Sequence, residues 1–302
     1  MTSSSRTTPQ TTHRTSRSRD FAWIIIAYAV ALLVAALVVY FSDATVLFKA
    51  GLADVLATLV IFAFSVMFAN SSFYDAYWSI APPVLLVYWA AALGVLDLRV
   101  AALGLLVGLW AVRLTHNWAR GWQGLSHQDW RYDDLREKTG VWYPLVDLLG
   151  IQLLPTVLVF IGCVPVYLVL SAGSLAAVPW SWLDGVWIVV GFAAVALEFV
   201  ADNQLRAHRL SADSAGKVLR QGVWAWCRHP NYLGELGFWF ALGICGYHVS
   251  GSLWSWAGIV VMLVLFLGIS IPMIDKRQLA NKPEYAQYKS QVWSLVPRFW
   301  SS

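Results

Sequence analysis

The sequence predicts an all-α protein, a polytopic bundle of helices that crosses a membrane seven or eight times. Three observations support this prediction. Of the 302 residues, 59% are hydrophobic and only 13% are charged, about half the charged fraction of an average soluble domain. The mean hydropathy is +0.60. The apolar residues gather in runs that approach the roughly 20 residues a spanning helix needs. Soluble, disordered and nucleic-acid-binding classes of protein are therefore excluded.

The elements follow in order along the chain. Residues 1–20 are rich in Ser, Thr and Arg and lack apolar periodicity, which predicts a disordered basic tail. Residues 21–302 are expected to form a single transmembrane domain. The first apolar run is longer than that of a signal peptide, so we expect it to remain as a membrane anchor. The expected spans are 21–41, 52–70, 82–97, 99–117, 145–170, 184–203, 233–248 and 253–273. Because the third and seventh are short, seven spans with one re-entrant or interfacial segment is the alternative.

Basic residues are distributed unevenly between the loops. With a cytoplasmic N-terminus, 18 of the 21 Lys and Arg residues fall on the cytoplasmic side, whereas Lys49 and Arg99 fall outside and Arg113 lies within a span. Cytoplasmic enrichment of basic residues is the usual topology signal. We therefore expect a multi-pass protein of a bacterial inner (cytoplasmic) membrane, with both termini in the cytoplasm. Both long loops are on that side, so soluble-facing chemistry is expected there.

The three cysteines are isolated from one another. Cys163 and Cys245 lie in apolar runs and Cys227 lies in a polar loop, so the sequence contains no CxxC pair. This pattern favours neither a disulfide framework nor a metal site. No metal ion is expected.

The fourth expected span carries polar residues on one face. Arg113, Asn117 and Arg120 follow one another at helical spacing together with His116. Ionisable groups within spans are costly and usually face a cavity or a partner. Snorkelling to the membrane surface is the alternative, and it explains Arg120 better than Arg113.

The sixth expected span ends in a similar way. Glu198, Asp202, Arg206 and Arg209 share a face in the stretch LEFVADNQLRAHR. A helix end with i, i+4 salt bridges is the structural alternative, stabilising by a few tenths of a kcal/mol. The two carboxylates follow the apolar run without a break, although a purely structural pair would be less costly in a loop. This placement favours a functional role.

The densest motif is RHPNYLGE over residues 228–235. Pro230 suits the first turn of a helix, and free backbone amides there, beside Arg228 and His229, are typical of a phosphate site. Glu235 follows one turn into the seventh expected span.

Near the C-terminus, Arg277 precedes Tyr285 and Tyr288, which lie on one helix face. This last group alone is typical of a basic helix at a membrane surface.

A further polar element, NSSFYDAYW over residues 70–78, contains no basic residue. Tyr74 and Tyr77 flank Asp75 in an aromatic setting directly after the second span. A carboxyl group in such surroundings suits a proton donor or a group that orients one. An aromatic belt at the membrane surface is the alternative interpretation.

Together these groups favour a large anionic cofactor that contains sugars. Asp202, Asn231 and Glu235 are suited to ribose hydroxyls or to an amide. The sequence has no GxGxxG, so a Rossmann domain is not expected, and the cofactor is expected in an intramembrane cavity between helices that faces the cytoplasm. The cationic residues expected to converge on one membrane face are Arg113, Arg120, Arg206, Arg209, Lys217 and Arg228.

The chain resembles a known superfamily of membrane enzymes. RHPNYLGE resembles the (R)HxNYLG(E/D) motif of steroid 5-alpha-reductases and sterol C14-reductases, and ADNQLRAHR resembles a helix of the same enzymes. KPEYAQY before VWSLVPRFW resembles a C-terminal segment that isoprenylcysteine carboxyl methyltransferases share with them. The whole chain most closely resembles the DUF1295 family, in which NSSFYDAYWS is a typical string. Residues 198–302 carry the most family-specific motifs.

The resemblance implies NADPH as the cofactor. Trp224 stands at an aromatic position of the family, Lys217 stands where an Arg is expected, and Glu198 replaces an Asn of the steroid reductases. Their catalytic Glu has no clear match in the second span, so Tyr74, Asp75 and Tyr77 become the candidate catalytic residues. The candidate cofactor-binding residues are Arg113, Asn117, Arg120, Glu198, Asp202, Arg206, Arg209, Lys217, Trp224, Arg228, His229, Asn231, Tyr232, Glu235, Arg277, Tyr285 and Tyr288.

Three functions remain open on the sequence alone. The favoured one, which the resemblance implies, is an NADPH-dependent oxidoreductase that reduces a C=C bond conjugated to a carbonyl in a steroid-like, isoprenoid or quinone-like substrate. The second is an S-adenosylmethionine-dependent methyltransferase of the isoprenylcysteine type. The third is a non-catalytic protein that binds lipid head groups. Membrane lipids and a lipophilic substrate are the expected partners, with no nucleic acid and no obligatory protein partner.

Overall fold

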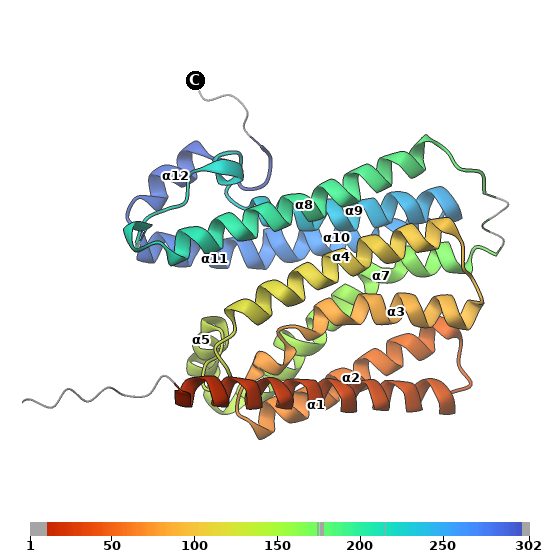
Figure 1. Cartoon of the computed structure of the whole chain (residues 1–302), viewed down its shortest axis with the longest axis horizontal. Helices are drawn as coiled ribbons and strands as arrows, with labels where there is room; N and C mark the ends of the chain where they lie inside the picture. The colour runs from red at the N-terminus through yellow and green to blue at the C-terminus, as the bar shows by residue number, and fades with distance from the viewer. Residues whose placement is uncertain (1–10, 174, 176–177, 215, 298–302) are drawn as a thin grey trace, which may run out of the picture. The chain divides into compact units, whose positions relative to one another are not determined.

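The computed structural model describes residues 11–297 except 174, 176–177 and 215, and for residues 11–16 it describes the backbone only. Within these residues every regular element is helical, as predicted (Figure 1). Seven stretches of the described chain are long and apolar enough to cross a membrane, and the protein is a multi-pass membrane protein. These stretches are Arg17–Phe41, Val46–Met67, Ser71–Leu93, Leu98–Gly121, Trp130–Ser171, Trp182–Leu210 and Leu253–Asn281.

The expected span 233–248 is not among these seven, although it is helical. It forms α9 (Pro230–Ser250), which has 21 residues and is buried along most of its length. Its first turns contain Asn231 and Glu235 and four glycines interrupt its apolar residues, so its hydropathy stays below that of the other spans. By length and apolar composition the described residues thus contain seven candidate spans, and α9, with 21 residues, is a further helix of spanning length.

The helices group into two compact units. Unit 1 comprises Met1–Ala81 and Leu114–Val157, and unit 2 comprises Pro82–Arg113 and Leu158–Ser302. The boundaries between the units fall inside three helices, α3 (Tyr77–Leu93), α4 (Leu98–Gly121) and α7 (Leu154–Ser171). Each candidate site lies within one unit.

In unit 1, α1 (Thr11–Phe41) packs against α2 (Val46–Met67). The tail predicted for 1–20 was expected to be disordered, but in the structure α1 includes residues 11–20, and residues 1–10 lie outside the described residues. Contacts with the 114–157 segment hold this end of α1. Arg17 donates a hydrogen bond to the Ala119 carbonyl at 2.8 Å, and Asp20 accepts one from the Leu125 amide at 3.0 Å.

The connection after α2 is a short 3₁₀ turn, η1 (Ser71–Tyr74), whose four residues are buried. The Asn70 side chain accepts a hydrogen bond from the Ser72 amide and caps this turn. Its amide also donates to the Leu125 carbonyl at 2.8 Å, which holds the turn against the second segment of unit 1. That segment contains α5 (Trp130–Thr139), η2 (Gly140–Trp142), α6 (Tyr143–Val146) and the π-helix η3 (Asp147–Leu153).

In unit 2, the main packing is between α8 (Trp182–Leu210) and α9. Glycines allow the two backbones to approach closely, as small residues do at helix contacts in membranes. A Cβ added at Gly234 would lie 2.4 Å from Cγ of Glu198 and 2.8 Å from the Ala194 carbonyl oxygen. This contact explains the glycine in RHPNYLGE, since it places Glu235 beside α8.

The remaining elements of unit 2 follow α8 and α9 along the chain. Among them, α10 is continued by the π-helix η8 and by α11, and α12 packs on α11. Their bounds are η5 (Ala212–Ser214), η6 (Gly222–Ala225), η7 (Leu253–Trp256), α10 (Ala257–Leu265), η8 (Phe266–Ser270), α11 (Ile271–Asn281) and α12 (Tyr285–Gln291).

A buried ion pair joins α4 to α8 in unit 2. Arg99 was assigned by the topology count to an outside loop, but it lies in the first turns of α4 and is fully buried. Its guanidinium donates to Asp184 at 2.8 and 3.1 Å. Asp184 also accepts from the Ser181 amide, the Trp187 indole and the His248 ring. Every carboxylate oxygen is therefore satisfied.

Candidate functional site

Unit 1 contains a buried phenol–carboxyl pair. The Tyr77 hydroxyl donates a hydrogen bond to Oδ1 of Asp54 at 2.8 Å. Tyr77 is the first residue of α3, and Asp54 is the ninth residue of α2. The exposed fractions of Tyr77 and Asp54 are only 8% and 7%. The second carboxyl oxygen, Oδ2 of Asp54, is buried and has no partner among the described residues. A carboxyl group within a membrane-spanning helix is costly, so this placement is typical of a functional site.

The pairing expected from the sequence was Asp75 with Tyr74 or Tyr77. In the structure, Asp75 instead accepts a hydrogen bond from the Tyr132 hydroxyl at 2.6 Å. The Tyr74 hydroxyl is hydrogen-bonded to Oγ1 of Thr156 at 2.9 Å. The carboxyl partner of Tyr77 is therefore Asp54, which the sequence analysis missed.

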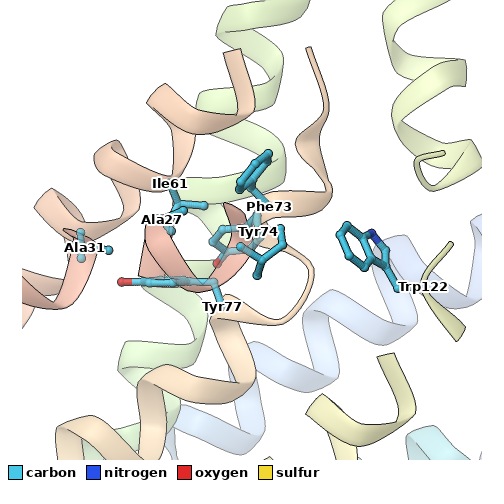
Figure 2. Close-up of a cluster of buried hydrophobic side chains, with 9 residues drawn as sticks. Ala27, Ala31, Ile61, Phe73, Tyr74, Tyr77 and Trp122 are labelled. Atoms are coloured by element: carbon cyan, nitrogen blue, oxygen red, sulfur yellow. The ribbon is translucent and has the colours of Figure 1, made fainter. Parts of the chain in front are cut away.

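Phe73, Tyr74 and Tyr77 of this segment are buried within unit 1, which argues against a lipid-facing aromatic belt. Figure 2 shows Tyr74 and Tyr77 in a cluster with Ala27 and Ala31 of α1 and Ile61 of α2. The two phenol rings are 5.6 Å apart between centroids. The small alanines of α1 belong to the same cluster, and the Tyr77 ring lies beside the first half of α2, where its hydroxyl bonds Asp54.

A second site, in unit 2, is built around Arg113. Its guanidinium contacts three carboxylates, from Glu198 and Asp202 on α8 and Glu235 on α9. The distances from Arg113 are 2.6 Å to Asp202 and 3.6 Å to Glu235. The sequence predicted these four residues as cofactor ligands, and the structure brings all four together. Oε1 of Glu198 is buried and has no partner among the described residues.

Two indoles hold Glu235 in place. Trp110 Nε1 donates to Oε2 at 3.1 Å, and Trp239 Nε1 donates to Oε1 at 2.9 Å. The Arg113 cluster therefore contains three carboxylates and one guanidinium in a mostly buried setting. Such a cluster is rich in hydrogen-bond acceptors and suits a neutral ligand group with N–H or O–H donors, rather than a phosphate.

Arg228 and His229 form a separate cluster with Asp275 of α11. Arg228 donates to Oδ2 of Asp275 at 3.1 Å and to the Val292 carbonyl at 2.7 Å. The His229 ring lies 3.3 Å from Oδ1. The sequence predicted both residues beside a phosphate, but in the structure their side chains tie the start of α9 to α11 and the C-terminal segment.

The predicted aromatic ligands are anchored close to this cluster. Tyr285 donates to Asp275, and Tyr288 donates to the Trp224 carbonyl at 2.6 Å. The Trp224 indole donates to the Ala201 carbonyl of α8 at 3.0 Å. These bonds fix α12 against η6 and α8, and burial raises the pKa of the Tyr285 and Tyr288 phenols.

Three basic residues, Arg209, Lys217 and Lys282, lie at the end of α8 or in the segments beyond it. Arg209 and Lys217 are exposed, and Lys282 donates to the Lys217 carbonyl at 2.8 Å. Burial lowers the pKa of Lys282, and the neighbouring Arg209 guanidinium lowers it further. The Glu284 carboxylate acts in the opposite direction, and an anion bound beside Arg209 would reduce the repulsion between the two cations further. Lys282 was not among the ligands predicted from the sequence.

The other predicted ligands are placed individually. Arg206 is half-buried on α8, and Arg277 is exposed on α11. On α9, Asn231 is half-buried, and the ring of Tyr232 stacks on Phe266 with 4.5 Å between centroids. In unit 1, Arg120 donates to the side-chain oxygen of Asn117 at 2.8 Å.

Comparison with known proteins places the chain in a family. Residues 61–292 match the family model described as a protein of unknown function (DUF1295). The chain is also similar to the protein named Uncharacterized protein C594.04c of the yeast Schizosaccharomyces pombe, with 26% identity over 265 residues, which covers 79% of this chain and 76% of that protein. No solved structure matches it.

Proposed function

The chain belongs to the DUF1295 family, and we propose that it is a membrane-embedded, NADPH-dependent reductase of a C=C bond conjugated to a carbonyl in a lipophilic substrate. The observation that supports this proposal best is the buried Tyr77–Asp54 pair, with its 2.8 Å hydrogen bond and its unpartnered carboxyl oxygen. A buried polar atom without a partner costs about 1–3 kcal/mol. When Asp54 is protonated, its carboxyl group donates to the Tyr77 oxygen, and the Tyr77 proton is then directed to a substrate carbonyl oxygen.

The chemistry assigned to unit 1 is acid catalysis. NADPH, when bound, supplies the hydride that forms the new C–H bond at the β-carbon. Tyr77 donates a hydrogen bond to the carbonyl oxygen and transfers its proton there as negative charge develops. The carboxyl proton of Asp54 replaces the proton on Tyr77, and the enol then returns to the ketone. Each turnover thus adds one hydride and one proton to the substrate and leaves Asp54 ionised.

The residues of unit 2 fit the cofactor in two parts. The acceptor-rich Arg113 cluster suits the carboxamide and ribose, because the unpartnered Oε1 of Glu198 is able to accept an N–H or O–H donor. The cations Arg209, Lys217 and Lys282 suit the phosphates. Arg228 and His229 hold Asp275 in this proposal, and their role is to position the start of α9.

The methyltransferase alternative is weaker on the same observations. S-adenosylmethionine carries a sulfonium cation and no phosphate, so it gives no reason for three basic side chains to lie at the end of α8 and beyond it. The distribution of basic residues between the loops favours cytoplasmic termini, and we include this topology in the proposal. It agrees with a reductase that takes its nucleotide from the cytoplasm.

A ligand-binding experiment tests the proposal directly. The full chain is purified in detergent, and bound nucleotide is sought by mass spectrometry and by absorbance at 340 nm. NADPH is expected to raise the melting temperature, whereas S-adenosylmethionine is expected to leave it unchanged. The reverse result replaces the reductase with the methyltransferase. Oxidation of NADPH is then followed with a panel of apolar enones that includes a 4-en-3-one steroid, a polyprenyl enone and a quinone.

A further inference from the structure

A reductase that protonates its substrate from a buried pair must recover one proton in each turnover. Asp54 lies eight residues after the start of the candidate span α2, and its side chain is buried. We propose that a seam of buried polar side chains between α2 and the η3–α7 segment carries this proton from Asp147 to Tyr77. This inference rests on the proposed function. The seam consists of Asp54, Thr58, Ser65, Ser71, Tyr74, Tyr143, Asp147, Gln152 and Thr156, all in unit 1.

The inner part of the seam is a chain of hydroxyl groups. Thr58 and the Tyr77 hydroxyl both donate to the Asp54 backbone carbonyl, which brings the two hydroxyls to the same oxygen. Oγ1 of Thr58 also lies 2.9 Å from Oγ1 of Thr156. Thr156 in turn contacts the Tyr74 hydroxyl at 2.9 Å. A hydroxyl both donates and accepts, so each member is able to take a proton on one side as it releases one on the other.

Each threonine of this chain is also held by its own helix. Thr58 donates to the Asp54 carbonyl, and Thr156 donates to the Gln152 carbonyl, each at 2.9 Å. These bonds to the carbonyl four residues earlier fix the side-chain rotamers. Both hydroxyls are thereby kept in line between Tyr74 and Tyr77 while their proton alternates between two acceptors.

The outer part of the seam is centred on Asp147, at the start of the π-helix η3. Asp147 accepts from Ser71 Oγ at 2.9 Å and from Gln152 Nε2 at 3.0 Å. The Ser71 hydroxyl lies 2.7 Å from the Tyr143 hydroxyl, and Gln152 also donates to Ser65 at 3.1 Å. A π-helix lets residues five apart share one face, which is how Asp147 and Gln152 meet. Oε1 of Gln152 is buried without a partner among the described residues.

The seam leads in one direction only. From Asp54 to Ser65 it follows α2 for eleven residues, about 16 Å at 1.5 Å per residue. On the other side of Asp54, the only buried residues that α2 contributes are Ala50 and Ala53. At the outer end, the half-buried Arg136 of α5 covers the Tyr143 ring, with its guanidinium 4.4 Å from the centroid. The two parts of the seam meet at Gln152, whose backbone carbonyl accepts from Thr156 and whose side chain donates to Asp147. The proposed relay requires a water molecule to carry the proton across this step, and it then links the pair to the surface that carries α5.

Simple adhesion between helices is the competing explanation. Side-chain hydrogen bonds between membrane helices stabilise by about 0.6 kcal/mol on average, and the Thr58–Thr156 and Ser65–Gln152 contacts fit that role. Adhesion requires no titratable group, however, and it gives no reason for a buried carboxylate at the outer end. It also predicts no effect on proton transfer, which makes the two explanations separable.

The test compares Thr156→Val and Asp147→Asn in the full chain in nanodiscs, with whichever enone of the panel the wild type reduces. We expect each variant to lower kcat at least tenfold with KM values within twofold, to make later turnovers slower than the first, and to increase the solvent deuterium isotope effect. Thr156→Ser restores the hydroxyl and is expected to restore kcat. Thr139→Val is the matched control, because Thr139 makes the same bond to the carbonyl four residues earlier, at 2.7 Å to Leu135, outside the seam.

A second measurement needs no substrate. Infrared spectroscopy after transfer to D₂O follows deuteration of the Tyr77 phenol, identified by its loss in Tyr77→Phe, and Thr156→Val is expected to slow this exchange at least tenfold. If the wild type reduces no enone, the proposed function is wrong. The rate of deuterium exchange at Tyr77 still tests whether the seam conducts protons. Wild-type exchange and turnover in Thr156→Val would refute the relay, and so would a Thr156→Ser variant as slow as Thr156→Val.

Discussion

Unit 1 contains two pairs in which a buried tyrosine donates to an aspartate, and only one of them is assigned to catalysis. Tyr77 donates to Asp54 at 2.8 Å, and Tyr132 donates to Asp75 at 2.6 Å. Tyr77→Phe and Tyr132→Phe remove the same oxygen from the same kind of pair. We predict that Tyr77→Phe lowers kcat/KM at least a hundredfold, whereas Tyr132→Phe leaves it within threefold of the wild type.

The size of the effect follows from the role assigned to each phenol. General acid catalysis contributes about 10²–10⁴ in rate, or about 2.7–5.5 kcal/mol at 1.36 kcal/mol per factor of ten. The cost in folding stability is expected to be similar for both variants. Each leaves a largely buried carboxyl oxygen without its donor, at about 1–3 kcal/mol. Loss of stability alone would therefore affect both variants equally.

The assay combines NADPH oxidation at 340 nm with thermal unfolding of the same preparations. NADPH affinity is measured separately by quenching of tryptophan fluorescence, and it is expected to remain within twofold because the assigned ligands lie in unit 2. Activity of Tyr77→Phe within threefold of the wild type would refute the assignment. A large loss in Tyr132→Phe alone would transfer the acid role to Asp75 and its partner.

Three further predictions concern unit 2. Arg209→Ala is expected to weaken NADPH binding tenfold or more, about 1.4 kcal/mol, while the exposed Lys276→Ala control leaves the Kd unchanged. Burial raises the pKa of the Cys227 thiol to about 11, against about 8.5 for a free thiol. In a Cys163→Ala, Cys245→Ala variant, alkylation of Cys227 at pH 8 should therefore be at least a hundredfold slower in the folded protein than in the denatured protein. The stability contributed by this thiol is full below about pH 8.5 and is lost as pH rises through the folded pKa, so the melting temperature should fall over that interval. Arg99→Met should destabilise by about 3–5 kcal/mol because it leaves a buried carboxylate unpaired, and a double variant that also replaces Asp184 by Leu should recover most of the loss in thermal unfolding.

Much of the fold follows from composition and spacing alone. Long apolar runs leave a chain few choices in lipid, since every backbone group must be paired within a helix. The all-helical class and the membrane location are accordingly confirmed by the structure. The start of α1 was less accessible to prediction, because residues 11–20 have no apolar pattern and their helix is held by contacts to Ala119 and Leu125. Such tertiary contacts leave no local signal.

The partner of Tyr77 was missed for a similar reason. Asp54 stands alone near the start of an apolar run, and in the sequence it is typical of a polar helix end. Its importance depends on the start of α2, which lies at Val46 rather than at 52, and on a contact with Tyr77, 23 residues later. The local neighbour Asp75 was the more visible candidate. The recurrence of Asp54, Thr58 and Ser65 along α2 was the available signal, because three polar residues on one face of a span rarely face lipid.

The buried cations show how burial changes the meaning of a charge. On the sequence, Arg113 and Arg228 count as phosphate ligands together with Arg209 and Lys217. In the structure, Arg113 and Arg228 are each less than a tenth exposed and are bound to carboxylates of their own unit. A guanidinium in a spanning segment requires such a partner in order to fold at all, with or without a ligand. A basic residue deep in a span therefore predicts a nearby carboxylate, and a phosphate is expected to bind where the helices end, beside the exposed Arg209 and Lys217.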